Sequence, residues 1–228
     1  MTIPDYHDSK IKIFKIIAGP YENNSYLVVC NKTNHSVLID APSDANEIIK
    51  LGQTTQLQMI IITHGHLDHI AGLNQIQSYI NVPVAISKSD SEQLKLVNYI
   101  NNIPNIYLED NTNIKVGNTS LKIIKTPGHT PGSICINTEK HLFTGDTLFP
   151  GGPGKTTSVK NFKQIVASIT SKLFILPINT VIYPGHGDKD ILENSIKEYK
   201  IFNTLNKGKD IFGDIVWKNN IINWYNKK

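Results

Sequence analysis

Four side chains that commonly bind metal ions lie within one short segment, Thr63–His69, which reads T-H-G-H-L-D-H. His64 and His66 are two residues apart, so on an extended chain their side chains point to the same side and can hold one ion together. Asp68 and His69 follow where the chain turns toward a helical pattern, so their side chains should diverge toward a second ion. The segment comes directly after a continuous apolar run that predicts a buried strand. The spacing therefore predicts two adjacent metal ions at the end of that strand.

One segment cannot complete two metal sites, and three further candidates occur in the same kind of position. His129, Asp146 and His186 each follow a predicted strand and a glycine, in the segments T-P-G-H-T-P-G-S, F-T-G-D-T and Y-P-G-H-G. Glycine permits a sharp turn and a close backbone approach at a crowded site. A single histidine after Pro-Gly is more often a turn residue than a ligand, so the indication of a metal centre comes from the whole set. Imidazole and carboxylate ligands suit Zn²⁺, iron and Mn²⁺.

These side chains need a scaffold that brings strand ends together. Short apolar runs bounded by turn-forming residues predict strands at Ile11–Ile17, Tyr26–Cys30, Val37–Ile39, Gln58–Ile62, Val82–Ile86, Leu121–Lys125, Ser133–Asn137, His141–Thr144 and Thr180–Tyr183. Helical spacing of apolar residues predicts helices at Ala45–Leu51, Ile70–Ile80, Ser89–Ile100, Val159–Leu173 and Ile191–Leu205. This order predicts an α/β (α+β) fold in which two sheets are covered on their outer faces by helices.

The composition predicts a chain that folds without disulfides. Its 228 residues are 39% hydrophobic, which is enough for a sizeable core. The two cysteines, Cys30 and Cys135, are far apart and form no C-x-x-C pair, so a thiolate zinc site is disfavoured and a reducing, cytoplasmic setting is expected. The first ten residues lack the apolar region of a signal peptide, and no apolar run is long enough to cross a bilayer.

The charge pattern argues against nucleic acid as a partner. The net charge is +4, and all of the 23 basic residues are lysines that are spread along the chain. Nucleic-acid-binding proteins usually concentrate their charge and use arginine for contacts to bases. The sequence therefore predicts neither a nucleic-acid partner nor a membrane partner, and it leaves the oligomeric state open.

The ordered set H-x-H-x-D-H, His, Asp, His resembles the metallo-β-lactamase superfamily, and the resemblance extends from Val37–Asp40 to Pro184–Gly187. It implies a four-layer αββα sandwich, formed by residues 1–228 as one domain, with two divalent metal ions, zinc first and iron or manganese as alternatives. It also implies the role of each ligand: His64, His66 and His129 hold the first ion, Asp68, His69 and His186 hold the second, Asp146 bridges both, and Asp40 supports the ligands from behind.

Within that superfamily, the sequences of the segments around His64, His129 and Asp146 are similar to those of glyoxalase II-type thioesterases. These enzymes hydrolyse hydroxyacyl-glutathione thioesters. Lys155 stands where that family has a substrate-binding lysine that contacts glutathione. Only 42 residues follow His186 and no arginine is available to bind a glutathione carboxylate. We therefore expect a similarity to compact, single-domain glyoxalase II-like proteins, with a thiol that need not be glutathione.

The resemblance and the ligand set together predict a metallo-hydrolase of small esters or thioesters, in which hydroxide attacks a carbonyl and Asp68 is catalytic as well as a ligand. Three alternatives stay open: a lactonase of the acyl-homoserine lactone type, an iron-dependent persulfide dioxygenase, and a non-catalytic metal-binding protein. Rates of hydrolysis of a lactone and of S-lactoylglutathione would separate the lactonase from the thioesterase. Oxygen uptake with glutathione persulfide would identify the dioxygenase. His7, His35 and His141 match no motif and are expected to be surface or structural residues.

Overall fold

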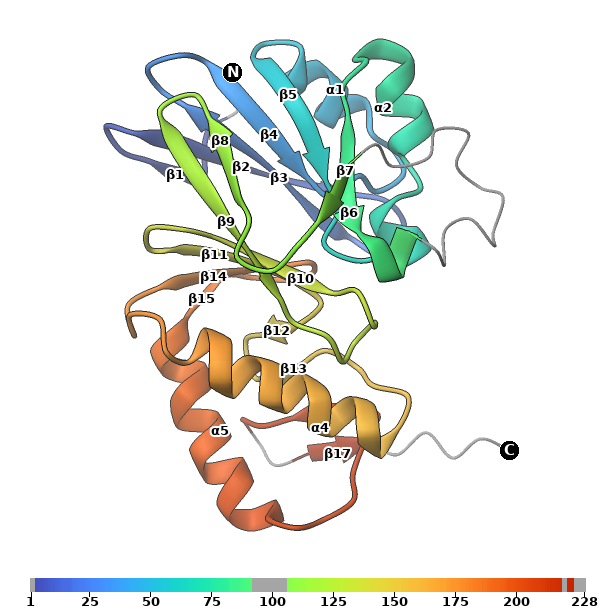
Figure 1. Ribbon diagram of the computed structural model, residues 1–228, viewed down its shortest axis with the longest axis vertical. Coiled ribbons are helices and arrows are strands. Elements are labelled where there is room, and N and C mark those ends of the chain that lie inside the picture. The colour runs from blue at the N-terminus through green and yellow to red at the C-terminus, as the bar shows by residue number, and fades with distance from the viewer. Residues whose placement is uncertain (1–2, 92–105, 219–220, 224–228) are drawn as a thin grey trace.

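The computed structural model describes residues 3–91, 106–218 and 221–223. Most of its strands form two large sheets (Figure 1). The first sheet has the order β1 (Tyr6–His7), β2 (Ile11–Ala18), β3 (Asn23–Cys30), β4 (His35–Ile39), β5 (Gln56–Ile61), β6 (Val84–Ser87) and β7 (Ile106–Leu108). The second has the order β15 (Asp190–Ile191), β14 (Val181–Pro184), β11 (His141–Gly145), β10 (Ile134–Thr138), β9 (Thr119–Lys125) and β8 (Asn113–Val116).

Two short strand pairs lie outside these sheets. They are β12 (Leu148–Phe149) with β13 (Gly152–Pro153), and β16 (Asp214–Val216) with β17 (Ile221–Asn223). Both pairs lie on the side of the second sheet that carries its helices, well away from the first sheet (Figure 1). The strand β12 follows the segment of Asp146, and β16 lies after that of His186 in the chain. Residues of β12, β13 and β16 line the cavity described below.

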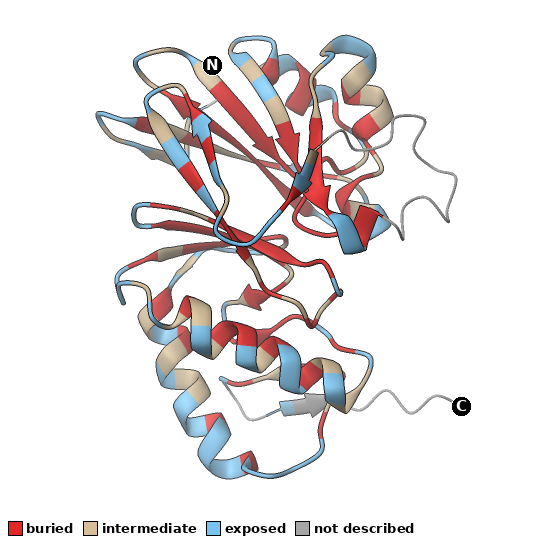
Figure 2. Ribbon diagram, viewed as in Figure 1, coloured by how far each residue is buried: buried red, intermediate tan, exposed pale blue. Residues whose placement is uncertain are grey.

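Helices cover the outer face of each sheet. The first sheet is covered by α1 (Asn46–Gly52) and α2 (Leu73–Tyr79), which share an apolar cluster with it. The second is covered by α4 (Val159–Ser168) and α5 (Leu192–Asn206), which form a separate cluster with it. A third cluster lies between the sheets and includes Val28, Val37, Ile123, Ile136 and Phe143. The predicted αββα sandwich is therefore confirmed, and the buried residues follow its three interfaces (Figure 2).

The burial of individual strands explains why the sequence forms these layers. All eight residues of β3 are buried, because one face of the strand meets the other sheet and the other face meets the helices. The neighbouring strand β2 alternates between buried and more exposed positions, as expected nearer a sheet edge. Removing apolar side chains from water at about 25 cal/mol per Å² is the main stabilising contribution in such a core.

The predicted strands and helices are found with small shifts at their ends. The helix predicted at Val159–Leu173 is α-helical to Ser168 and continues as a π-helical turn, Ile169–Leu173. The helix predicted at Ser89–Ile100 is helical as far as Ser91, and its remainder lies outside the described residues. The prediction omitted the shortest strands, such as β15, because two or three residues show no hydrophobic alternation.

The ends of β5, β9, β11 and β14 carry the predicted ligands to one edge of the sandwich. Within the second sheet, β11 is parallel to β14, and β9 and β11 are both antiparallel to β10. Their carboxyl ends therefore point the same way, and the segment after β5 meets them from the first sheet. Backbone hydrogen bonds join the two sheets at this edge, from the amide of Ile134 to the carbonyl of Thr63 (2.9 Å) and from the amide of Asn24 to the carbonyl of Gly185 (2.7 Å). No helix in the described part of the chain has the length and apolar character needed to span a membrane.

His141, at the other end of β11, is a structural residue as expected. It is 1% exposed, packs against the ring of Tyr6 and lies 3.1 Å from the hydroxyl of Tyr183. Burial and the nearby Lys140 lower its pKa to about 4. The unfolded chain therefore binds a proton more readily than the folded chain, and stability should fall as the pH drops from about 6.5 toward 4.

We expect His141→Gln to remove most of this pH dependence. The shift corresponds to roughly 3 kcal/mol of unfolding free energy. Urea unfolding at several pH values between 7.5 and 4.5 measures it, with the metal-free protein used throughout. His7→Gln, which changes an exposed histidine, is the control and should leave the pH dependence intact. An unchanged slope in His141→Gln would show that other groups cause the loss of stability in acid.

Candidate metal centre

The first predicted ligand set is brought together by the structure. The Nε2 atom of His64 lies 3.0 Å from Nδ1 of His66, and Nε2 of His129 lies 2.9 Å from the same Nδ1 atom. One ring nitrogen from each of these three residues can be chosen so that all three atoms lie within 4.8 Å of one another. His64 and His66 converge because the chain between them is extended, as the spacing predicted. Three imidazoles in this arrangement can hold one divalent cation.

The second set lies directly beside the first. The Nε2 atom of His186 is 3.3 Å from Oδ2 of Asp68, and Nε2 of His69 is 3.6 Å from the same oxygen. Asp68 and His69 belong to a 3₁₀ turn, Leu67–His69, which rotates their side chains away from those of His64 and His66. The turn is the local reason why neighbouring residues supply two different clusters.

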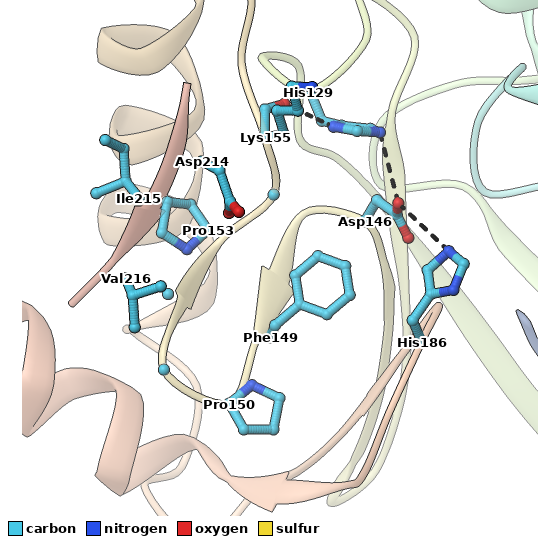
Figure 3. A pocket seen from close by; sticks show the side chains of 13 residues that line it. His129, Asp146, Phe149, Pro150, Pro153, Lys155, His186, Asp214, Ile215 and Val216 are labelled. Atoms are coloured by element: carbon cyan, nitrogen blue, oxygen red, sulfur yellow. Dashed lines mark hydrogen bonds and ion pairs between the residues drawn. The ribbon is translucent and has the colours of Figure 1, made fainter. Parts of the chain in front are cut away.

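Asp146 lies between the two sets. Its Oδ1 atom is 3.4 Å from Nε2 of His69, while Oδ2 is 3.6 Å from Nε2 of His129 and 3.8 Å from Nε2 of His186. Its carboxylate thus faces one member of the first set and two of the second, and Figure 3 shows it between His129 and His186. This is the position from which one carboxylate can contact two cations.

The chemistry of these groups fits bound cations. Among the described residues, Nε2 of His69 and Oδ1 of Asp146 are buried side-chain atoms without a hydrogen-bond partner. Buried polar atoms are rarely left without partners in a folded protein, and such atoms call for a bound ion or water. The clustered imidazoles and carboxylates also suit zinc, iron and manganese. The His/Asp cluster is therefore able to bind metal ions, and its residues fit a dinuclear site.

Asp40 contacts the ligand segment Thr63–His69 without facing the other ligands, in line with the supporting position that the family resemblance implies. Its carboxylate accepts hydrogen bonds from the backbone amide of Thr63 (2.8 Å), from the Thr63 hydroxyl (2.8 Å) and from Nδ1 of His69 (2.9 Å). The last bond leaves Nε2 of His69 directed at the other ligands. Asp40 is 1% exposed and has a φ of 61°, a left-handed conformation that aspartate tolerates better than most residues.

Hydrogen bonds orient other ligands in the same way. For the histidines the bond is made by the second ring nitrogen, and for Asp68 by a carboxylate oxygen. Nδ1 of His129 lies 2.8 Å from the carbonyl oxygen of Lys155, and Nδ1 of His186 lies 3.0 Å from that of Tyr21. Donation to a carbonyl fixes the tautomer and leaves Nε2 free to act as a ligand. Asn23 donates to Oδ2 of Asp68 (2.9 Å). No sequence pattern distinguishes Tyr21 or Asn23, because they come from a loop and a strand far from the ligand motifs.

The protonation of the ligands differs across the site. Burial and the surrounding imidazoles lower the pKa of His64 well below its ordinary value, so it is already neutral. Burial alone would lower the pKa of His69, but Asp40 and Asp146 outweigh it and raise that pKa well above the ordinary value. A histidine must be neutral to bind a metal ion, so metal binding has to displace a proton from His69.

Asp90 is a further residue of the site, and it joins two ligand segments. Its carboxylate accepts hydrogen bonds from the amide of Gly65 (2.8 Å), the hydroxyl of Thr130 (2.7 Å) and the amide of Gly132 (2.7 Å). It is fully buried. Asp90 falls in the helix predicted at Ser89–Ile100, and no motif distinguishes it there. Its position just after β6 was the available signal, because that strand ends at the same edge as the ligand segments.

We expect Asp90→Asn to reduce metal affinity by roughly 10- to 100-fold, the usual cost of losing a group that orients ligands. An amide can accept at one oxygen but places its NH₂ group against one of the three donors. The segments around His64 and His129 should then separate. Competitive titration with a chelating dye measures the metal affinity, and Asp110→Asn, which alters a carboxylate paired with Lys172 at 2.7 Å, is the control. If Asp90→Asn bound metal as tightly as wild type, Asp90 would contribute to folding and not to the orientation of the ligands.

The glycine before His186 is required by close packing. A Cβ atom on Gly185 would lie 2.3 Å from Oδ1 of Asp146 and 2.7 Å from Cε1 of His69. His69 is buried, and so is the Oδ1 atom of Asp146, so neither group can move away cheaply. The glycine thus lets the backbone pass directly against the ligand cluster, as the sequence predicted.

A cavity of about 380 Å³ opens beside the cluster (Figure 3). Its wall includes His129, Asp146 and His186 from the ligand set. The remaining wall comes from residues 149–155, including Lys155, and from β16. Lys155 therefore lies where a residue can meet a molecule bound at the cluster, beside His129. The expected substrate-binding role of Lys155 remains a prediction.

Comparison with known proteins agrees with these observations. The model of the Metallo-beta-lactamase superfamily matches residues 18–186. A hydroxyacylglutathione hydrolase of Pelagibacter ubique is 34% identical over 176 residues, which cover 75% of this chain and 70% of that protein. Human mitochondrial persulfide dioxygenase ETHE1 is 31% identical over 188 residues, covering 78% of this chain and 69% of that protein. The chain spans between 61% and 70% of the length of the hydroxyacylglutathione hydrolases that it matches.

The fold is also similar to that of solved structures in this superfamily. The crystal structure of TTHA1623 in a di-iron-bound form has a TM-score of 0.67 and 26% sequence identity. The alignment covers 81% of this chain and 97% of that chain.

Proposed function

Because the chain belongs to the metallo-β-lactamase superfamily, we propose that it is a dinuclear metal-dependent hydrolase that cleaves a small ester or thioester in the manner of glyoxalase II. The observation that carries this proposal is the convergence of the seven ligand side chains, with Asp146 between the two sets, next to an open cavity. The first cation would be held by His64, His66 and His129. The second would be held by Asp68, His69 and His186.

The chemistry that such a pair of cations supplies is a lower pKa for water and polarisation of a carbonyl group. Asp68 is placed to orient the attacking water and to accept its proton. Burial opposes its charge, but His186, His69 and Asn23 outweigh that effect and lower its pKa, so it is a carboxylate at neutral pH. Asn23 holds Oδ2 at 2.9 Å and so limits rotation of the carboxylate.

The cavity would hold the rest of the substrate. Phe149 and Pro153 line it with apolar surface, and Lys155 adds a positive charge. Apolar walls exclude water from the reacting carbonyl, which strengthens electrostatic interactions there. No nucleophilic side chain is needed, because the attacking group is water and the reaction passes through no acyl-enzyme.

The proposal is tested by loading the purified protein with Zn²⁺, Fe²⁺ or Mn²⁺ and measuring hydrolysis of S-D-lactoylglutathione, acetyl thioesters, an acyl-homoserine lactone and simple esters. We expect hydrolysis of at least one thioester or ester, its loss on chelation and its return when the metal is restored. A fully loaded protein that hydrolyses none of these compounds would contradict the proposal. Faster hydrolysis of the lactone than of every thioester would favour the lactonase alternative.

A persulfide dioxygenase activity is the second candidate, because the human relative with that name matches 78% of this chain at 31% identity. Oxygen uptake by the iron-loaded protein with glutathione persulfide tests it directly. We expect no uptake above the rate of the metal-free protein, since the second ligand set of Asp68, His69 and His186 favours two cations and hydrolysis. Rapid, iron-dependent uptake would replace the hydrolytic proposal.

A further inference from the structure

One wall of the cavity beside the ligand cluster is formed by the strand β16, which lies outside the ligand motifs. Asp214, Ile215 and Val216 line the cavity from this strand. In the close view they lie on the opposite side of the cavity from Asp146 and His186 (Figure 3). A molecule that reaches from the cluster across the cavity would therefore meet this strand.

Backbone hydrogen bonds hold this strand against the loop at the base of the cavity. Thr156 donates its amide to the carbonyl of Gly213 (3.0 Å), just before β16, and Trp217 donates its amide to the carbonyl of Gly151 (2.6 Å), just after it. The indole of Trp217 is buried at 1% exposure. Both ends of the strand are thus fixed to the loop. Asp214 has a defined position relative to the cavity, as a specificity-determining side chain requires.

Asp214 supplies a negative charge at this wall. Asp146 and Asp214 are the two acidic residues among the described residues that line the cavity, and Asp146 belongs to the ligand cluster. Within the described residues, the Asp214 carboxylate takes part in no hydrogen bond or ion pair, and it is half-buried. Ile215 and Val216, which follow Asp214 in β16, add apolar surface to this wall, and Lys155 is the basic residue in the described lining. A carboxylate in this setting attracts a cation and repels an anion that enters the cavity.

We propose, on the basis of the hydrolytic function above, that Asp214 selects thioesters whose thiol part carries a positive charge. A small acyl group at the cluster does not fill a cavity of about 380 Å³, so the longer part of the substrate, the thiol, extends toward β16. An ammonium group on this part would lie near the Asp214 carboxylate. A carboxylate on it would be repelled, and this disfavours anionic thiols such as glutathione at that wall.

The test compares two acetyl thioesters of similar size and opposite charge, acetylthiocholine and S-acetyl-3-mercaptopropionate. Thiol release by the metal-loaded wild type and by Asp214→Asn gives kcat/KM for each. The intrinsic reactivity of each thioester cancels when the two proteins are compared. We expect wild type to prefer the cationic thioester and Asp214→Asn to lower that preference about fivefold or more, the effect of one partly exposed charge on two substrates of opposite sign. Asp210→Asn should leave the preference unchanged.

Asp210 is a suitable control because it is exposed, pairs with Lys163 at 2.8 Å and does not line the cavity. A second measurement needs no turnover: calorimetric titration of the metal-loaded proteins with thiocholine and with 3-mercaptopropionate. Weaker thiocholine binding and tighter 3-mercaptopropionate binding in Asp214→Asn support the proposal. An equal charge preference in wild type and Asp214→Asn, in either measurement, overturns it. Loss of hydrolysis in every protein, with a clear difference in calorimetry, would instead overturn the hydrolytic function alone.

Discussion

Replacement of Asp146 by asparagine should abolish hydrolysis and remove metal from both sites at once. The Asp146 carboxylate lies 3.4 Å from Nε2 of His69 and 3.6 Å from Nε2 of His129, so it faces both ligand sets. Asparagine keeps the shape but removes the charge that offsets two divalent cations. We expect kcat/KM to fall by more than the roughly 10- to 100-fold that follows loss of a merely supporting group. Elemental analysis of the dialysed protein and thioester kinetics measure the two effects.

Asp188→Asn is the matched control, because it removes the same charge from a fully exposed carboxylate two residues beyond His186. Its metal content and activity should equal those of wild type. Circular dichroism and thermal unfolding would establish that Asp146→Asn is folded. If that folded variant retained both ions, Asp146 would not bridge the sites.

Replacement of Asp40 by alanine should produce the largest loss of stability. The substitution leaves the Thr63 amide, the Thr63 hydroxyl and Nδ1 of His69 without their shared acceptor. His69, which Asp40 helps to keep charged, would also lose a buried counter-charge. Breaking a buried pair in this way costs about 3–5 kcal/mol. Urea unfolding of the metal-free protein measures the loss, and metal affinity should fall about 10- to 100-fold as well.

Asp44→Ala is the control that separates the loss of the Asp40 carboxylate from the effect of backbone strain on stability. Asp44 is exposed, yet its φ of 58° is close to the 61° of Asp40, so alanine meets the same backbone strain at both positions. We expect Asp44→Ala to cost about 1 kcal/mol or less. An equal loss in both variants would assign the effect of Asp40 to backbone conformation and not to its hydrogen bonds.

The ligand cluster could be predicted from sequence because its signals are local. His64, His66, Asp68 and His69 lie in one segment, and the Gly-His and Gly-Asp steps mark the other strand ends. The layers of the fold followed in the same way from hydrophobic periodicity, since runs such as that of β3 are buried on both faces.

The remainder of the site depends on contacts between distant segments, which periodicity does not report. Asp90 joins Gly65 to Gly132 across 67 residues of sequence, and Asn23 contacts Asp68 from the start of β3. The cavity wall formed by Asp214 is set by backbone pairing of a short C-terminal strand with a loop. Neither feature has a composition or spacing that distinguishes it from ordinary surface sequence.

The most direct test of the dinuclear site is the location of metal ions in crystals of the protein grown with Zn²⁺, from anomalous diffraction measured at the zinc edge. We expect two zinc peaks per chain, one bonded to His64, His66 and His129 and the other to Asp68, His69 and His186, with Asp146 touching both. The absence of zinc from this cluster, or its presence only elsewhere on the molecule, would contradict the dinuclear site and the hydrolysis that depends on it.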